Sequence, residues 1–152
     1  MLFGCAKAFP PETLDTADRD IRFGEIQKNP SAFEGKSVLL GGVIIETQNL
    51  STKTVLVVSQ RELNFSQKPA ADEQSKGRFM VSSPQFLDPA IYRKGRAITV
   101  IGRVVGEEVQ PIDGVPYRYP LIQKEALHLW PAPENMRSEP SFQFGINFGF
   151  GF

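Results

Sequence analysis

Two stretches of the chain repeat one pattern of glycine, basic and apolar positions. Residues 35–46 read GKSVLLGGVIIE and residues 95–105 read GRAITVIGRVV, so a glycine and a basic residue precede each apolar run. Gly42 and Gly102 stand at the same place in the two runs. A glycine inside a strand marks a bulge or a tight bend. The pattern therefore predicts two neighbouring central strands, bent at matching places in a closed or nearly closed sheet. Two unrelated apolar strands are the alternative.

Further apolar segments complete a pattern of five short strands separated by turn residues. The other strands are residues 52–60, residues 77–82 and a last strand within residues 117–130, split or bulged near Pro120, and the fourth strand spans residues 97–107. Asp113-Gly114 predicts a hairpin turn before the last strand, and Asp88-Pro89 predicts a one-turn helix before the fourth. This is the strand order of the OB-fold, a partly open Greek-key barrel. The sequence therefore predicts an all-β domain: a small, OB-fold-like, five-stranded antiparallel barrel with short helices.

Alternation along the fourth strand predicts which side chains fill the barrel. Ile98, Val100 and Val104 fall on one face and are expected inside, whereas Thr99 and Arg103 fall on the other and are expected outside.

The segment before the barrel carries mixed signals. Paired prolines argue against regular helix in residues 8–12, which are expected to form an extended tether. A short helix is expected within residues 18–29, capped by Asp18 or Asp20, with Ile21 and Ile26 facing the barrel. Phe33 is expected to plug the end of the barrel, and residues 61–76 to form a long polar loop.

Charge and cysteine content restrict the class of protein. The chain of 152 residues is long enough for one domain with tails, and its formal net charge is zero. Neutrality argues against a generic nucleic-acid binder and against a polybasic membrane patch, because both need surplus lysine and arginine. One cysteine and one histidine exclude an intramolecular disulfide and make a Cys/His zinc site improbable.

Leu2-Phe3-Gly4-Cys5-Ala6 matches the bacterial lipoprotein signal, or lipobox. The cysteine thiol of such a motif takes a diacylglycerol, a peptidase cuts just before it, and the new N-terminus is acylated. A signal also needs a basic and an apolar region, and only four residues precede the cysteine. We expect these four residues to be the remnant of a signal. Ala6 replaces the aspartate that retains lipoproteins at the inner membrane, which favours the outer membrane. A free cysteine near a disordered end is the alternative.

The end of the chain alternates strictly between apolar and polar or glycine positions. The apolar positions are Phe142, Phe144, Ile146, Phe148, Phe150 and Phe152. This period of two is typical of a strand with one aromatic face, and it resembles the last strand of outer-membrane barrels. A lone strand cannot span a bilayer, because its backbone groups would lack partners. The tail is therefore expected to contact membrane, further copies or an envelope partner. A disordered Gly/Phe-rich tail is the preferred alternative to an ordered strand.

Four features imitate catalytic or binding motifs. Residues 35–37 copy the end of a phosphate-binding loop, but its first glycine is missing and a strand follows instead of a helix. His128 has no cysteine or acidic partner at ligand spacing. The carboxylate pairs at residues 72–73 and 107–108 fit solvated surface better than acid–base chemistry. The sequence thus offers no convergent catalytic set and no metal site.

A series of short motifs carries a family resemblance. In order they are Cys5, residues 30–35 leading into Val38 and Gly41-Gly42, residues 77–79, 87–92, 95–96, 99–102, 106–107 and 117–120, and Leu129-Trp130. From Cys5 to Pro131 the chain resembles the Slp family of outer-membrane lipoproteins, which is named for a starvation-inducible member. The resemblance implies a lipid-anchored envelope protein of poorly defined role and brings no catalytic residues.

These observations predict four regions and a location. Residues 1–4 are the signal remnant, 5–17 the lipid anchor and tether, 18–131 the barrel, and 132–152 a proline-containing linker and aromatic tail. The expected protein is lipid-anchored in the outer membrane of a Gram-negative bacterium and faces the periplasm. It has no cofactor beyond the lipid on Cys5, and it acts as a structural or interaction module, with a stress or starvation role left open.

Two other function classes remain. An enzyme is opposed by the missing catalytic set. An OB-fold module that binds oligosaccharide or single-stranded nucleic acid is opposed by neutral charge, although Tyr92, Tyr117 and Tyr119 could form a stacking platform. Packing of these tyrosines is the preferred interpretation, and a basic, aromatic-lined groove would favour the binding module.

Overall fold

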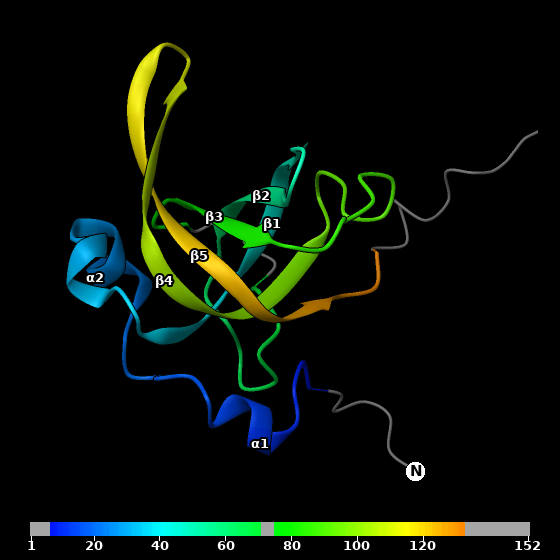
Figure 1. The fold of residues 1–152 in the computed structure, drawn as a ribbon. Helices are drawn as coiled ribbons and strands as arrows, with labels where there is room; N and C mark the ends of the chain where they lie inside the picture. Colours follow the sequence, from blue (N-terminus) through cyan, green and yellow to red (C-terminus); the bar gives the residue numbers. More distant parts are fainter. Residues whose placement is uncertain (1–6, 71–74, 133–152) are drawn as a thin grey trace, which may run out of the picture.

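The computed structural model describes residues 7–70 and 75–132. Within them the chain forms five strands, two short α-helices and one 3-10 helix (Figure 1). The strands are β1 (Ser37–Asn49), β2 (Thr54–Gln60), β3 (Arg78–Ser83), β4 (Ala97–Ile112) and β5 (Val115–Leu129). The helices are α1 (Pro11–Leu14), α2 (Phe23–Lys28) and η1 (Pro30–Phe33). No helix in the described ranges is long and apolar enough to cross a membrane.

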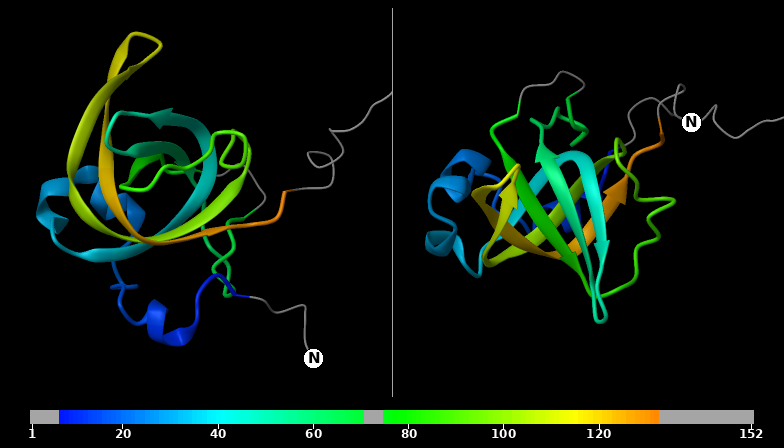
Figure 2. Two further views of the ribbon diagram at one scale, coloured as in Figure 1. Left: turned by 45° about the vertical axis from the view of Figure 1, so that its right-hand side comes forward. Right: turned by 90° about the horizontal axis from the view of Figure 1, so that it is seen from above.

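The five strands close into a barrel in the order β1-β2-β3-β5-β4, and β4 pairs back with β1 (Figure 2). This confirms the predicted all-β, OB-fold-like barrel. The antiparallel expectation fails for one pair, since β3 and β5 are parallel. The reason is the connection. The hairpin turns β5 antiparallel to β4, so that β5 runs in the same direction as β3 where the two strands pair.

The two glycine-containing strands are neighbours, as their shared pattern predicts. Val38 of β1 lies opposite Gly102 of β4, and Gly42 lies opposite Ile98. A Cβ at Gly42 would overlap the carbonyl oxygen of Ser59 on β2. A Cβ at Gly102 would lie 2.5 Å from the carbonyl oxygen of Gln123 on β5. Both glycines are therefore required because the backbone of an adjacent strand approaches them closely.

The barrel interior is filled by the side chains that alternation predicts. Ile98, Val100 and Val104 are fully buried in one cluster with residues from the other strands and from α2. Each such burial contributes roughly 1.5–3 kcal/mol. Thr99 points away from this cluster but is also fully buried, with its hydroxyl donating to the carbonyl oxygen of Gln67 at 2.5 Å. Part of the outer wall is therefore covered, whereas Arg103 is exposed as expected.

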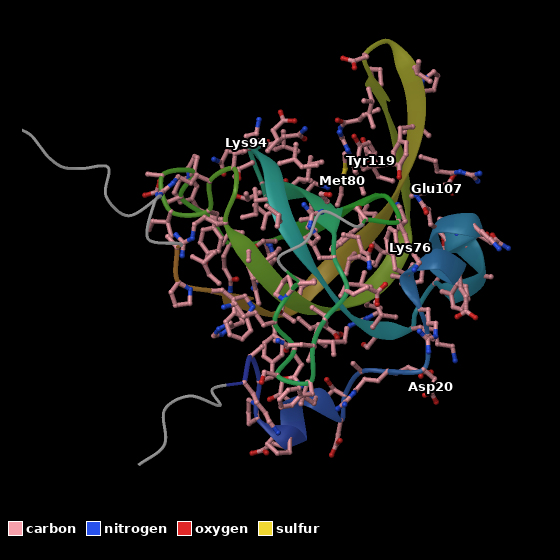
Figure 3. The ribbon with its side chains drawn as sticks, turned by 180° about the vertical axis from the view of Figure 1, so that it is seen from behind. Asp20, Lys76, Met80, Lys94, Glu107 and Tyr119 are labelled. Carbon is pink, nitrogen blue, oxygen red and sulfur yellow. The ribbon has the colours of Figure 1, made fainter. Side chains whose placement is uncertain are left out.

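The strands β4 and β5 continue beyond the barrel as a two-stranded arm. The arm ends in the predicted hairpin turn, where Asp113 and Gly114 have φ of 51° and 83° as a type I′ turn requires. It projects on the side opposite α1 (Figure 1). Its base packs on the outside of β2 and β3, where Tyr119 meets Met80 in a second cluster (Figure 3). The arm therefore covers the outer β2–β3 face.

A third cluster attaches the start of the described chain to the barrel wall. Phe9 and Leu14 are buried there against Ile101 of β4. The expectation of no helix in residues 8–12 is wrong, because α1 begins at Pro11. Proline is tolerated in the first helical position, where its missing N–H has no role. The described part of the expected tether thus lies on the barrel.

The helix expected within residues 18–29 is shorter than predicted. It begins at Phe23, after the N–H of Arg22 donates to Glu25 Oε1 at 3.1 Å, and neither Asp18 nor Asp20 caps it. Asp18 instead accepts the N–H of Asp20 and donates its own N–H to Ser37, which keeps these residues in a turn.

The apolar side chains of this region lie as expected. Ile26 of α2 is fully buried in the barrel core. Ile21 and Phe33 are partly buried against the same core.

Two smaller expectations need correction. Residues 88–92 make a single hydrogen-bonded turn, in which Asp88 caps the N–H of Ala90 at 2.9 Å, but no helix forms. Pro120 pairs regularly with Glu107, and the register shift nearest to it comes from an extra residue on β4, Val105. The irregularity of β5 itself lies further along the strand, at Glu125.

Candidate functional site

A groove of about 730 Å³ lies between the segment before the barrel and the β2–β3 loop. One wall comes from residues 19–28, the other from residues 60–67, and Lys76 lies on the rim. Residues 39–41 of β1 contribute to the floor. Pockets of this size are typical of sites for small molecules or for parts of larger ones.

The floor depends on the missing side chain at Gly41. A Cβ there would overlap Leu63 and would lie 3.3 Å from Pro69 Cγ. The carbonyl oxygen of Gly41 accepts the N–H of Arg61 at 2.9 Å. The β2–β3 loop can therefore lie directly on β1, which forms the groove.

The loop itself is fixed by local hydrogen bonds. Asn64 Oδ1 accepts the N–H groups of Ser66 and Lys68, at 2.8 and 3.1 Å. The N–H of Asn64 donates to the carbonyl oxygen of Lys68 at 3.0 Å. Gln67 has a φ of 64° and is buried. Phe65, at the tip of this turn, is 84% exposed, the largest value among the exposed large hydrophobic side chains described.

The groove is lined by more cations than carboxylates. The cations are Arg19, Arg22, Lys28, Arg61 and Lys76, and the carboxylates are Glu25 and Glu62. Lys76 and Glu62 form an ion pair at 3.5 Å, but both side chains are 62% exposed, so the pair adds little stability. In the described parts of the chain no carboxylate lies within ion-pair distance of Arg19, Arg22 or Lys28. Their charge is available to an anionic partner.

The groove lies beside the start of the described chain. The N–H of Ala8 donates to the carbonyl oxygen of Ser66 in the β2–β3 loop at 3.3 Å. Cys5 precedes Ala8 by three residues, so their Cα atoms are at most about 11 Å apart. A lipid on Cys5 would therefore place the bilayer next to this loop.

The site residues predicted from sequence lie outside the described residues. They are Leu2, Phe3, Gly4, Cys5 and Ala6 of the lipobox, and Phe142, Phe144, Ile146, Phe148, Phe150 and Phe152 of the tail. The groove was not predicted, because its two walls are distant in sequence and the net charge of zero hides a local excess. The weak signal that could have found it is the small excess of charge in residues 19–28, which hold three cations and two carboxylates.

The tyrosines are placed in packing and hydrogen-bonding roles. The rings of Tyr117 and Tyr119, both on β5, lie edge to face with their centroids 4.8 Å apart. The hydroxyl of Tyr117 accepts hydrogen bonds from Gln27 Nε2 at 2.6 Å and from the N–H of Arg78 at 3.0 Å. Tyr92 packs separately against the barrel core. The three rings therefore form no common stacking platform.

His128 occupies an aromatic corner on the outer wall. Its ring lies edge to face with Trp130 at 4.4 Å and with Phe9 at 6.4 Å. Burial lowers the pKa of His128, so the neutral ring is favoured. Among the described residues no group of three or more His, Cys, Asp or Glu side chains could hold a metal ion.

Comparison with protein-family models matches residues 2–149 to the outer membrane lipoprotein Slp family. The chain belongs to this family. Its relatives include the outer membrane protein Slp of Escherichia coli K12, 27% identical over 131 residues, which are 85% of this chain and 69% of the relative. An uncharacterized protein of Haemophilus influenzae is 34% identical over 85% of this chain and 70% of its own length. The uncharacterized lipoprotein YeaY of Escherichia coli K12 is 28% identical over 86% of this chain and 67% of its own length.

The family match confirms the resemblance drawn from short motifs. It identifies the chain as an outer-membrane lipoprotein of the Gram-negative envelope. The lipidation of Cys5 in particular stays a prediction.

Proposed function

We propose that the protein is anchored in the outer membrane by a lipid on Cys5, and that its barrel is a structural or interaction module held at the membrane surface. The observation that carries the proposal is the packing of Phe9 and Leu14 on the barrel. Because that segment is fixed, the anchor is separated from the folded domain by only a few residues. The link to stress or starvation is part of the same proposal and rests on the family resemblance alone.

The chemistry of the anchor suits this role. The thiol of Cys5 displaces the headgroup phosphate of a membrane phospholipid and so forms a thioether to diacylglycerol. Hydrolysis of the peptide bond between Gly4 and Cys5 frees the amino group, which then takes an acyl chain from a phospholipid ester and releases the lysophospholipid. Each buried CH₂ contributes about 0.8 kcal/mol, and two chains suffice for stable attachment. With a short connection the barrel wall lies against the bilayer instead of at a distance from it.

The covered β2–β3 face supports a structural or interaction module over a module that binds oligosaccharide or single-stranded nucleic acid. OB-folds bind such ligands on the face of strands 2 and 3 and with the loops beside it. In this protein the arm packs Tyr119 onto the outer β2–β3 face, against Val57 and Met80. The usual ligand face is therefore covered by the protein's own chain.

Replacement of Cys5 by serine tests the proposal. The parent and Cys5→Ser proteins are expressed behind an intact lipoprotein signal in a Gram-negative host, with a labelled fatty acid in the medium. We expect label in the parent alone and loss of tight membrane association in the variant. Val109→Ser, a change on the exposed arm, is the matched control and should keep the label. A parent that takes up no label would overturn the proposal.

A further inference from the structure

We propose that the tip of the β2–β3 loop and the adjoining groove form a second membrane contact, in which Phe65 enters the lipid interface and the cations of the groove face anionic phospholipid headgroups. The occupant is the phospholipid surface of the membrane. The inference rests on the proposed function, because the lipid on Cys5 is what brings this face to the bilayer.

The first step is position. The hydrogen bond between Ala8 and Ser66 holds the loop beside the chain that leads from Cys5. The reach of three residues limits Cys5 to about 11 Å from Ala8. The arm lies on the opposite side of the molecule from α1 and this loop (Figures 1 and 2). An anchored molecule therefore presents the loop to the bilayer and the arm to the aqueous side.

The second step is rigidity. A single exposed apolar side chain is ordinary on a protein surface. Phe65 differs because the turn that carries it lies on Gly41 of β1 and is held by four hydrogen bonds of Asn64. Three join Asn64 to Ser66 and Lys68 as described above, and in the fourth the carbonyl oxygen of Asn64 accepts the N–H of Gln67 at 2.9 Å. The ring is thus held out from the barrel at the anchored end. Its insertion into the lipid interface does not require the loop to become ordered first. Aromatic rings and amphipathic segments of this kind favour the interfacial layer of a bilayer.

The third step is charge. Arg19 and Lys28 line the groove next to the loop and have no carboxylate at ion-pair distance among the described residues. Asp18 and Asp20 flank Arg19 in sequence and reduce the local excess, but neither lines the groove. A cation close to an anionic membrane surface strengthens binding about fivefold. The whole chain is neutral, so this attraction also orients the molecule.

Depth measurement on the lipidated protein tests the orientation. Phe65→Trp and Phe86→Trp are placed singly in the full chain and reconstituted in vesicles that contain brominated lipids. Phe86 is a matched control, since it is 70% exposed on the loop after β3. The fluorescence of Trp130, measured in the parent, is subtracted. We expect the remaining tryptophan fluorescence to be quenched by bromine and shifted to the blue in Phe65→Trp alone. Equal quenching of both, or none for Phe65→Trp, would overturn the proposal.

Binding without the anchor tests the chemistry of the contact. The full-length Cys5→Ser protein is mixed with vesicles of phosphatidylcholine alone or with one quarter phosphatidylglycerol. We expect binding only with the anionic lipid, about tenfold weaker for Phe65→Ser. We expect about thirtyfold weaker binding for Arg19→Gln/Lys28→Gln. Lys53→Gln/Lys94→Gln removes the same charge from other exposed loops and should bind as the parent does.

The outcomes separate this inference from the proposed function. The vesicle experiment needs no lipid on Cys5. If the Cys5→Ser protein does not bind anionic vesicles, the loop contact is wrong, whether or not Cys5 is acylated in the parent. Each comparison is repeated after deletion of residues 140–152, because the aromatic tail is expected to contact membranes as well. If the two pairs of charge variants bind alike, or if the protein binds soluble glycerol phosphate as well as vesicles, the membrane contact is wrong.

Discussion

The backbone N–H of Ala8 and the carbonyl oxygen of Ser66 are joined by a hydrogen bond of 3.3 Å. This bond links the chain that leads from the predicted lipid anchor to a loop nearly sixty residues later. Together with the packing of Phe9 and Leu14 on the barrel, it places the start of the described chain beside the loop that lines the groove. The attachment of residues 8–14 to the barrel is therefore the first feature to test.

Phe9→Ala and Leu14→Ala should each destabilise the domain by about 2–4 kcal/mol, because both side chains are buried in one small cluster. Glu12→Ala, an exposed change on the same helix, should leave stability nearly unchanged. Urea unfolding of the Cys5→Ser background measures all three. Equal midpoints for the three variants would show that the segment is not attached.

Gly42→Val and Gly102→Val should each lower the free energy of unfolding by about 1–3 kcal/mol or prevent folding. The added side chain would collide with the backbone of β2 or of β5. Gly24→Ala is the control, since the added Cβ would lie 3.9 Å from Lys76 Cδ, an ordinary contact, and a helical alanine is favoured. If thermal midpoints stayed the same for both valine variants, the close-approach argument would fail.

These features differ in how far the sequence predicts them. The pairing of β1 with β4 and the inward side chains of β4 follow from local patterns, a repeated glycine spacing and a period of two. The seating of Phe9 and Leu14 does not, because two apolar residues separated by prolines show no periodicity. The groove is not predicted from sequence either. Arg19 and Arg61 are distant in the chain and line the same groove only because of the barrel topology.

The single histidine gives a prediction for pH dependence. Burial among aromatic rings lowers the pKa of His128 below its ordinary value of 6.5. The unfolded chain therefore takes up a proton near pH 6.5 before the folded protein does. The contribution of this group to stability is complete above that pH and falls as the pH drops toward the folded-state pKa.

An NMR titration of the His128 ring should give a pKa below 6.5. The stability difference between the parent and His128→Gln should shrink as the pH is lowered from 7.5 to 5. A ring that titrates at or above 6.5 would contradict the buried aromatic corner.

Deletion of residues 140–152 should leave the unfolding midpoint nearly unchanged. The aromatic alternation lies beyond Trp130, and prolines at 131, 133 and 140 separate it from β5. The deletion should also reduce detergent dependence, oligomerisation or co-purification with envelope partners, since an apolar stripe of this kind marks a contact site. A truncated protein that unfolds several degrees lower would mean that the tail is part of the barrel core.

The central claim is that the barrel is fixed to the outer membrane through Cys5. Mass spectrometry of the N-terminal tryptic peptide tests it most directly, because trypsin cuts after Lys7 and leaves only residues 5–7. The protein is expressed behind an intact lipoprotein signal and purified from outer membranes. We predict a peptide that begins at Cys5 and carries diacylglyceryl and N-acyl groups. A peptide that contains residues 1–4 with a free Cys5 thiol would contradict the account.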